Sequence, residues 1–79
     1  MFHPFLTTSR GVLYDSDCLE ILRALRSGVV DTVFADPPFN IGYDYDVYDD
    51  RLGYDKYLAW SHDWISAVYR ALKPDGTFW

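Results

Sequence analysis

The chain has 79 residues, so it is at most one small domain, and such a domain buries only about 60% of its unfolded surface. Hydrophobic residues make up 49% of the chain and aromatic residues 19%, which excludes the intrinsically disordered class. The net charge of −5 is opposite in sign to that of a free-standing nucleic-acid module, so any phosphate-binding surface lies mostly elsewhere.

The N-terminal segment, residues 1–10, has no helical or strand periodicity and is predicted to form an arm ahead of the folded part, residues 11–79. It lacks the basic start and the long apolar stretch of a secretory signal. No apolar run approaches the roughly 20 residues that a membrane-spanning helix needs. These features predict a cytoplasmic protein with no membrane partner.

A short strand and a helix are predicted next. Gly11–Tyr14 is a short apolar run, which indicates a strand. Residues 18–27 have apolar side chains at helical spacing, and Asp17, followed by a glutamate three positions later, resembles a helix-starting capping box. Gly28 suits the end of this helix.

The segment Val29–Ala35 is β-branched and almost wholly apolar. Apolar side chains at neighbouring positions predict a strand that is buried on both faces, as in the centre of a parallel sheet. Pro37 and Pro38 have no N–H to donate to a neighbouring strand, so the strand must end near Asp36.

The rest of the chain is predicted to contain a loop, a long helix and the start of a strand. Residues 39–55 are rich in Tyr and Asp and form a connection longer than most. Residues 54–73 then carry two apolar stripes at helical spacing, which predicts a broad buried face. The first stripe contains Tyr57, Trp60, Trp64, Ala67 and Ala71, and the second contains Leu58, Ile65, Val68 and Leu72. "KPDG", residues 73–76, predicts a turn, and a strand begins at Thr77.

The predicted order is therefore strand, helix, strand, helix, strand. That alternation is typical of an α/β fold with a parallel sheet and right-handed crossovers. Metal binding is not expected, because Cys18 is the single cysteine and His3 and His62 lie far apart in the sequence. We expect Cys18 to be a small buried residue on a helix face, Trp60 and Trp64 to belong to the core, and His62 to lie on a helix face.

The segment "DPPF", Asp36 to Phe39, is the main candidate for chemistry. In open α/β sheets, ligands bind at the carboxyl ends of strands, which is where Asp36 falls. A carboxylate, a proline carbonyl and an aromatic ring on a stiff turn suit a planar group that bears an –NH₂. The same residues also suit a turn that merely ends a strand, and spacing alone leaves both interpretations open.

The stretch "VDTVFADPPFNIGYDY" resembles the D-P-P-Y/F motif and flanks of the amino-methyltransferases that act on DNA bases. "LYDSDCLEILRAL" resembles the segment that precedes this motif in the family, although Ser16 stands where the family often has Gly. "YLAWSHDWISAVYRALKPDGTFW" resembles the helix, the R-x-L-K-P-x-G turn and the strand that follow it. The resemblance covers about residues 11–79 and matches a permuted subgroup in which this motif lies near the N-terminus.

The resemblance implies a partial Rossmann-like fold, with three parallel strands and two helices of a larger doubly wound sheet. It implies that Asp36 and the Pro37 carbonyl accept hydrogen bonds from the amine of the target base, on a turn that Pro38 stiffens. Phe39 would stack on that base after it has been flipped out of the duplex. Asp17 and Asp36 would lie near the methyl donor, S-adenosylmethionine, although Asp17 suits a helix N-cap equally well.

The family also indicates the reaction and its partners. An Asp at the first motif position fits methylation of adenine N6 in double-stranded DNA, within a restriction-modification context. Methylation of cytosine N4 or of RNA adenine, and a non-catalytic interaction module, remain alternatives. The family's F-x-G-x-G donor loop and its target-recognition region do not occur in these residues. The chain is therefore expected to be a fragment that is inactive and marginally stable on its own.

Overall fold

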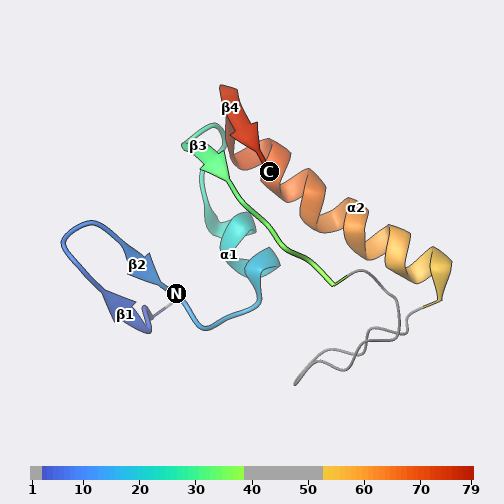
Figure 1. Ribbon diagram of the computed structural model, residues 1–79, viewed down its shortest axis with the longest axis horizontal. Helices are drawn as coiled ribbons and strands as arrows, with labels where there is room; N and C mark the ends of the chain where they lie inside the picture. Colours follow the sequence, from blue (N-terminus) through green and yellow to red (C-terminus); the bar gives the residue numbers. More distant parts are fainter. Residues whose placement is uncertain (1–2, 39–52) are drawn as a thin grey trace.

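The computed structural model describes residues 3–38 and 53–79. Within these ranges the elements follow in the order β1 (Leu6–Thr7), β2 (Val12–Leu13), α1 (Cys18–Ala24), β3 (Val30–Val33), α2 (Tyr54–Ala71) and β4 (Leu72–Phe78). α2 is the longest element, α1 lies beside it, and β3 and β4 run side by side near its C-terminal end (Figure 1). Neither helix combines the length and apolar character that crossing a membrane requires, within these described ranges. Of the predicted loop at residues 39–55, only the last three residues are described, and Tyr54 and Asp55 belong to α2.

β3 and β4 form a parallel pair, which confirms the predicted direction of these two strands. Val30 pairs with Leu72 and Val33 with Phe78. Backbone hydrogen bonds continue the pairing beyond both ends of β3, from the Val29 N–H to the Ala71 carbonyl (2.9 Å) and from the Ala35 N–H to the Trp79 carbonyl (2.9 Å). The hydrogen-bonded stretch therefore agrees with the predicted strand at residues 29–35.

The prediction of three parallel strands was wrong. β2, which falls within the predicted strand Gly11–Tyr14, pairs antiparallel with β1 through Leu6–Leu13 and Thr7–Val12 contacts. The two strands form a separate hairpin away from the β3–β4 pair (Figure 1). A short turn, in which the Thr8 N–H donates to the Gly11 carbonyl at 2.8 Å, brings them together. Closing such a short loop costs little entropy, so β2 pairs with its neighbour in sequence.

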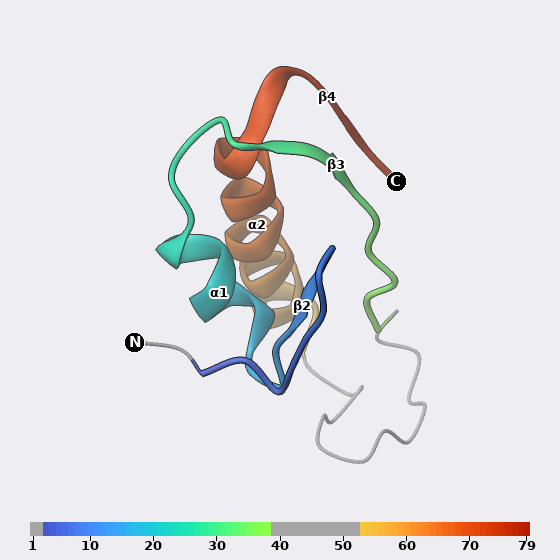
Figure 2. The same cartoon turned by 90° about the vertical axis from the view of Figure 1, so that its left-hand side faces the viewer.

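The expected burial of both faces of the second predicted strand was also wrong. Val30 and Val33 are half-buried, whereas Phe34 is 79% exposed. α1 and α2 lie on the same side of the β3–β4 pair (Figure 2). A strand covered by helices on one side shields only half of its side chains.

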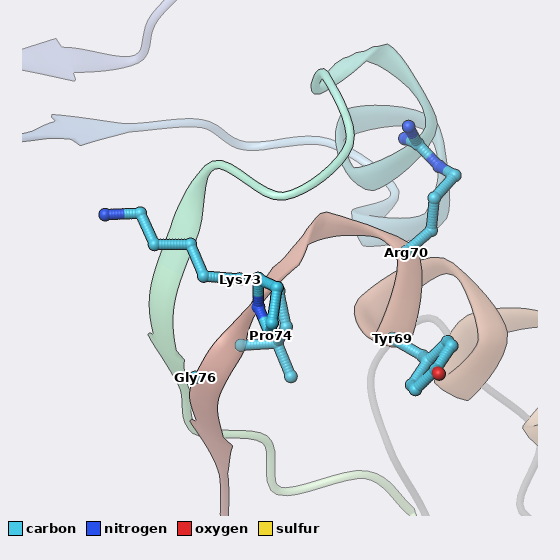
Figure 3. Close-up of a pocket in the computed structure, with 6 residues that line it drawn as sticks. Tyr69, Arg70, Lys73, Pro74 and Gly76 are labelled. Atoms are coloured by element: carbon cyan, nitrogen blue, oxygen red, sulfur yellow. The ribbon is translucent and has the colours of Figure 1, made fainter.

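α1 begins at Cys18, as predicted, but ends at Ala24 rather than at Ser27. The Asp17 carboxylate caps its start by accepting a hydrogen bond from the Leu19 N–H at 2.9 Å. At the other end, Arg70 of α2 reaches across to α1 (Figure 3) and donates to carbonyls of the last turn, including those of Leu22 at 2.8 Å and Leu25 at 2.7 Å. These bonds satisfy carbonyls that a longer helix would have bonded internally.

Gly28 lies beyond the end of α1, in the turn that leads into β3. Its φ of 66° is in the left-handed region, which favours glycine. Its N–H donates to the Arg70 carbonyl at 3.0 Å. Gly28 therefore aligns β3 with the end of α2. The prediction that Gly28 ends α1 was wrong.

The core is formed by one stripe of α2. Trp64, Ala67, Val68 and Ala71 are buried, and Ala71 is fully so. The first predicted stripe is thus confirmed at its C-terminal half, whereas Tyr57 and Trp60 are half-buried. The second stripe is only partly buried: Leu58 and Ile65 are 47% and 44% exposed, contrary to expectation, because that side of α2 has only partial cover.

The predicted turn at residues 73–76 is an irregularity inside β4. Between the Val30–Leu72 and Thr32–Thr77 pairs, β3 advances by two residues and β4 by five. Pro74 fits this interruption of the pairing, because it has no N–H to donate to the neighbouring strand. At Gly76 an added Cβ would lie 2.9 Å from Leu72 Cδ2 and 3.1 Å from the Asp31 carbonyl oxygen, so glycine is required by close packing.

Candidate active site

The carboxyl end of β3 carries Asp36, Pro37 and Pro38 out of the sheet. The Ala35 N–H donates to the Trp79 carbonyl at 2.9 Å, and Asp36 follows directly after this bond. Asp36 is exposed, and both prolines are half-buried. Beyond the ladder, the Tyr57 hydroxyl donates a hydrogen bond of 2.9 Å to the Pro38 carbonyl. The turn is therefore fixed to β4 at one end and to α2 at the other.

A hollow of about 260 Å³ opens beside this turn. One wall is the chain from Ala35 to Pro38, and the others are the start of α1, at Cys18, and the aromatic side of α2, at Trp60 and Trp64. Asp36 and the two prolines thus border a hollow whose walls are mainly apolar and partly aromatic. Such a set of groups suits a flat ring that donates hydrogen bonds at its edge.

A second hollow of about 490 Å³ adjoins the first and shares Cys18, Trp60 and Trp64 with it. Its other lining residues run from Asp15 to Leu19. The structure therefore brings the two predicted carboxylates, Asp17 and Asp36, to neighbouring hollows at the same end of the fold. Asp17 is engaged as the N-cap of α1, as the alternative interpretation predicted.

Phe39, the fourth predicted site residue, lies outside the described residues. A cluster of three or more potential metal ligands is not found among residues 3–38 and 53–79. The described part of the candidate site therefore consists of hydrogen-bond acceptors, aromatic rings and one thiol.

Residues 30–79 match the sequence model of the DNA methylase family. This range is more than half of the chain and contains β3, the Asp36–Pro38 turn, α2 and β4. The chain belongs to the DNA methylase family.

Characterised relatives agree with this assignment. The chain is 43% identical over 75 residues to the type II methyltransferase M.BamHI of Bacillus amyloliquefaciens, covering 94% of this chain and 18% of the relative. It is 42% identical over 64 residues to M.HpaI of Haemophilus parainfluenzae, covering 81% of this chain and 20% of the relative. It is 36% identical over 76 residues to M.ScaI of Streptomyces caespitosus, covering 96% and 24%. The chain thus spans about a fifth of the length of these relatives, and no solved structure matches it significantly.

Three aromatic residues of this DNA methylase chain line or support the site, although the sequence had assigned them to a core stripe. The rings of Tyr57 and Trp60 have centroids 5.9 Å apart, and those of Trp60 and Trp64 are 6.1 Å apart. Trp64 also meets Phe78 of β4 edge-on at 5.9 Å. Trp64 is buried as expected, but it and Trp60 line both hollows as well. The helical spacing of these aromatic residues predicted that they share one side of α2. It did not predict which other element that side would face.

Cys18 differs from the sequence expectation in its exposure. The residue is exposed at the mouth of both hollows and is not buried on a helix face. Partial burial of the sulfur, and secondarily the negative charge of Asp17, raise the pKa of its thiol above the ordinary value of 9.0. The thiol is therefore protonated at neutral pH, which disfavours a nucleophilic role.

A separate hollow of about 480 Å³ lies at the opposite, amino end of the β3–β4 pair (Figure 3). Its basic side chains are already engaged within the DNA methylase chain. Arg70 binds carbonyls of α1, and the Lys73 ammonium lies 2.8 Å from the Asp31 carboxylate. His62, expected on a helix face, is exposed on α2 and lines another shallow hollow.

Proposed function

We propose that the gene product carrying this chain transfers a methyl group from S-adenosylmethionine to the N6 amine of an adenine flipped out of double-stranded DNA. The observation that carries this proposal is the Asp36–Pro38 turn, which is held at both ends beside an aromatic-walled hollow. Family membership and type II methyltransferase relatives support the reaction class and the restriction-modification context. A cytoplasmic location accords with a DNA substrate.

Asp36 and the Pro37 carbonyl would each accept one hydrogen of the amine. With both hydrogens held in the plane of the ring, the nitrogen lone pair points out of that plane toward the incoming methyl group. This is catalysis by positioning and by electrostatic complementarity. The exposed Asp36 carboxylate also offers a route to water for the proton that the nitrogen loses. Phe39 would stack on the flipped base.

S-adenosylmethionine supplies an electrophilic methyl group on a positively charged sulfur. The second hollow has suitable chemistry for such a molecule, because Asp15 and Asp17 bring negative charge and Trp60 and Trp64 bring apolar surface. Asp17 and Asp36 are the residues through which this chain would contribute to donor binding. The rest of the donor site and the DNA recognition region would come from parts of the protein outside these residues.

The defining experiment uses the full-length gene product with defined duplex oligonucleotides and radiolabelled methyl donor. Nucleoside analysis of the product should show N6-methyladenine; N4-methylcytosine, or methylation of RNA alone, would assign the enzyme to the alternative substrates. Asp36→Ala should lower methyl transfer by at least about 100-fold, because one of the two acceptors is lost.

DNA binding and the unfolding midpoint of the Asp36→Ala variant should stay close to those of the parent protein, because Asp36 is exposed and Ala has no charge to bury. An active Asp36→Ala variant would remove the proposed role of the carboxylate. A parent protein that binds DNA but never methylates it would favour the non-catalytic module instead.

A further inference from the structure

The Tyr57 hydroxyl connects two parts of the candidate site that are nineteen residues apart in sequence. It donates to the Pro38 carbonyl at 2.9 Å, in partly buried surroundings. We propose that Tyr57 is a positioning residue: its hydrogen bond holds the Asp36–Pro38 turn so that Asp36 and the Pro37 carbonyl face the amine together. This inference rests on the proposed methyl transfer, but it concerns a residue outside the D-P-P-F motif.

The turn needs such an anchor because prolines fix only half of its backbone freedom. Their rings hold φ near −65°, but ψ remains free to rotate and carries the carbonyl with it. Neither Pro37 nor Pro38 has an N–H that could hold it in a ladder. The Ala35–Trp79 bond fixes the chain before Asp36, and the Tyr57 bond fixes it at Pro38. The Pro37 carbonyl lies between these two points, so its direction depends on both.

Tyr57 is well supported for this role. It lies in the first turn of α2, it is half-buried, and its ring contacts that of Trp60. Trp60 in turn packs on Trp64, which is anchored in the core. The hydroxyl is therefore presented by a chain of packed rings, and a hydrogen bond in such surroundings is stronger than one in open water. Removing only the hydroxyl should leave the ring and the helix in place.

The test is Tyr57→Phe in the full-length gene product, with Tyr69→Phe as the matched control. Tyr69 lies on the same helix but is 82% exposed and lines the hollow at the opposite end of the strand pair. We expect kcat to fall about tenfold in Tyr57→Phe, since a misdirected acceptor lowers the population of reactive geometries. The KM values for DNA and for S-adenosylmethionine should stay within about twofold, and Tyr69→Phe should match the parent protein.

A second readout does not depend on catalysis. The amide of Ala35, which donates to Trp79, should exchange with solvent several-fold faster in Tyr57→Phe than in the parent protein or in Tyr69→Phe, because the turn has lost its second anchor. A general structural defect would instead change both KM values and lower the unfolding midpoint together with kcat.

The outcomes separate the two proposals. If the parent protein methylates a base and Tyr57→Phe keeps the parent kcat, the positioning role is overturned while the proposed function stands. If the parent protein methylates no base, the proposed function fails, and the exchange rates still decide whether Tyr57 holds the turn. Unchanged exchange at Ala35 would overturn the inference whatever the activity.

Discussion

The two ends of the β3–β4 pair differ in how their polar groups are used. At the amino end, Arg70 binds the end of α1, and Lys73 pairs with Asp31 at 2.8 Å. At the carboxyl end, Asp36 is exposed, and the Trp64 indole N–H is buried with no hydrogen-bond partner among the described residues. The charged groups at the amino end therefore satisfy one another, whereas the Asp36 carboxylate at the carboxyl end remains open to solvent.

We infer that the amino end of the β3–β4 pair contributes mainly to stability and the carboxyl end mainly to function. Substitutions at the amino end should therefore destabilise the fold, and those at the carboxyl end should mainly change the site. Three experiments on the full-length gene product address the contrast, with urea unfolding followed by circular dichroism for the first two.

Gly76→Ala should have the largest effect at the amino end. The added Cβ would lie 3.0 Å from the Lys73 carbonyl oxygen and 3.1 Å from the Asp31 carbonyl oxygen, so backbone must move. We expect the free energy of unfolding to fall by about 2–3 kcal/mol. Gly11→Ala is the control, because the nearest atom to its Cβ, Thr8 Oγ1, lies 3.7 Å away. Similar losses in the two variants would mean that the irregularity in β4 is not closely packed.

Arg70→Ala should have the next largest effect. It removes hydrogen bonds to the Leu22, Arg23 and Leu25 carbonyls and to the Ser27 hydroxyl. These bonds are exposed to solvent, so we expect a loss of about 1–2 kcal/mol together with lower helicity of α1. Arg26→Ala removes the same group from an exposed position after α1 and serves as the control. If Arg70→Ala matched Arg26→Ala, the contact between the helices would not depend on this guanidinium.

The smallest effect concerns Cys18, at the carboxyl end. The pKa of the Cys18 thiol is raised above 9.0 in the folded protein, so less thiolate is present at pH 8 than in the unfolded protein. Iodoacetamide should therefore alkylate Cys18 a few-fold more slowly in the folded protein than in the protein unfolded by urea. Because the folded protein holds the thiol proton more tightly than the unfolded protein, this proton contributes to the free energy of unfolding. The contribution is complete below pH 9.0 and declines as the pH rises through the raised pKa. Cys18→Ser should lose this alkaline decline. Equal alkylation rates with and without urea would show that the hollow gives the sulfur no shelter.

The sequence predicted the elements whose causes are local. Apolar periodicity located α2 to within two residues at its end, and the β-branched run at residues 29–35 located β3 with the hydrogen bonds that extend it. α1 was predicted three residues too long, because its last carbonyls are bound by Arg70, which is more than forty residues away. The strand at Gly11–Tyr14 was predicted to be parallel, but it pairs antiparallel with Leu6–Thr7, a partner close by in the sequence.

The candidate site was predicted in a similar way. Asp36, Pro37 and Pro38 follow from one contiguous motif, and the structure places them at a strand end, as expected. The contact between Tyr57 and Pro38 was not foreseen, since it depends on how the chain returns after residues 39–52. Trp60 illustrates the same limit, because a helical stripe identifies the inward side of a helix but not which of its residues border a hollow.

The irregularity in β4 has a consequence for insertions and deletions in this family. Its three additional residues form an odd number, so they reverse the alternation of side chains between the Val30–Leu72 and Thr32–Thr77 pairs. With one residue fewer, Phe78 would no longer lie opposite Val33, and its ring would leave the edge-on contact with Trp64. Homologues should therefore keep the length of the K-P-x-G segment constant even where its residues vary, unlike most surface connections.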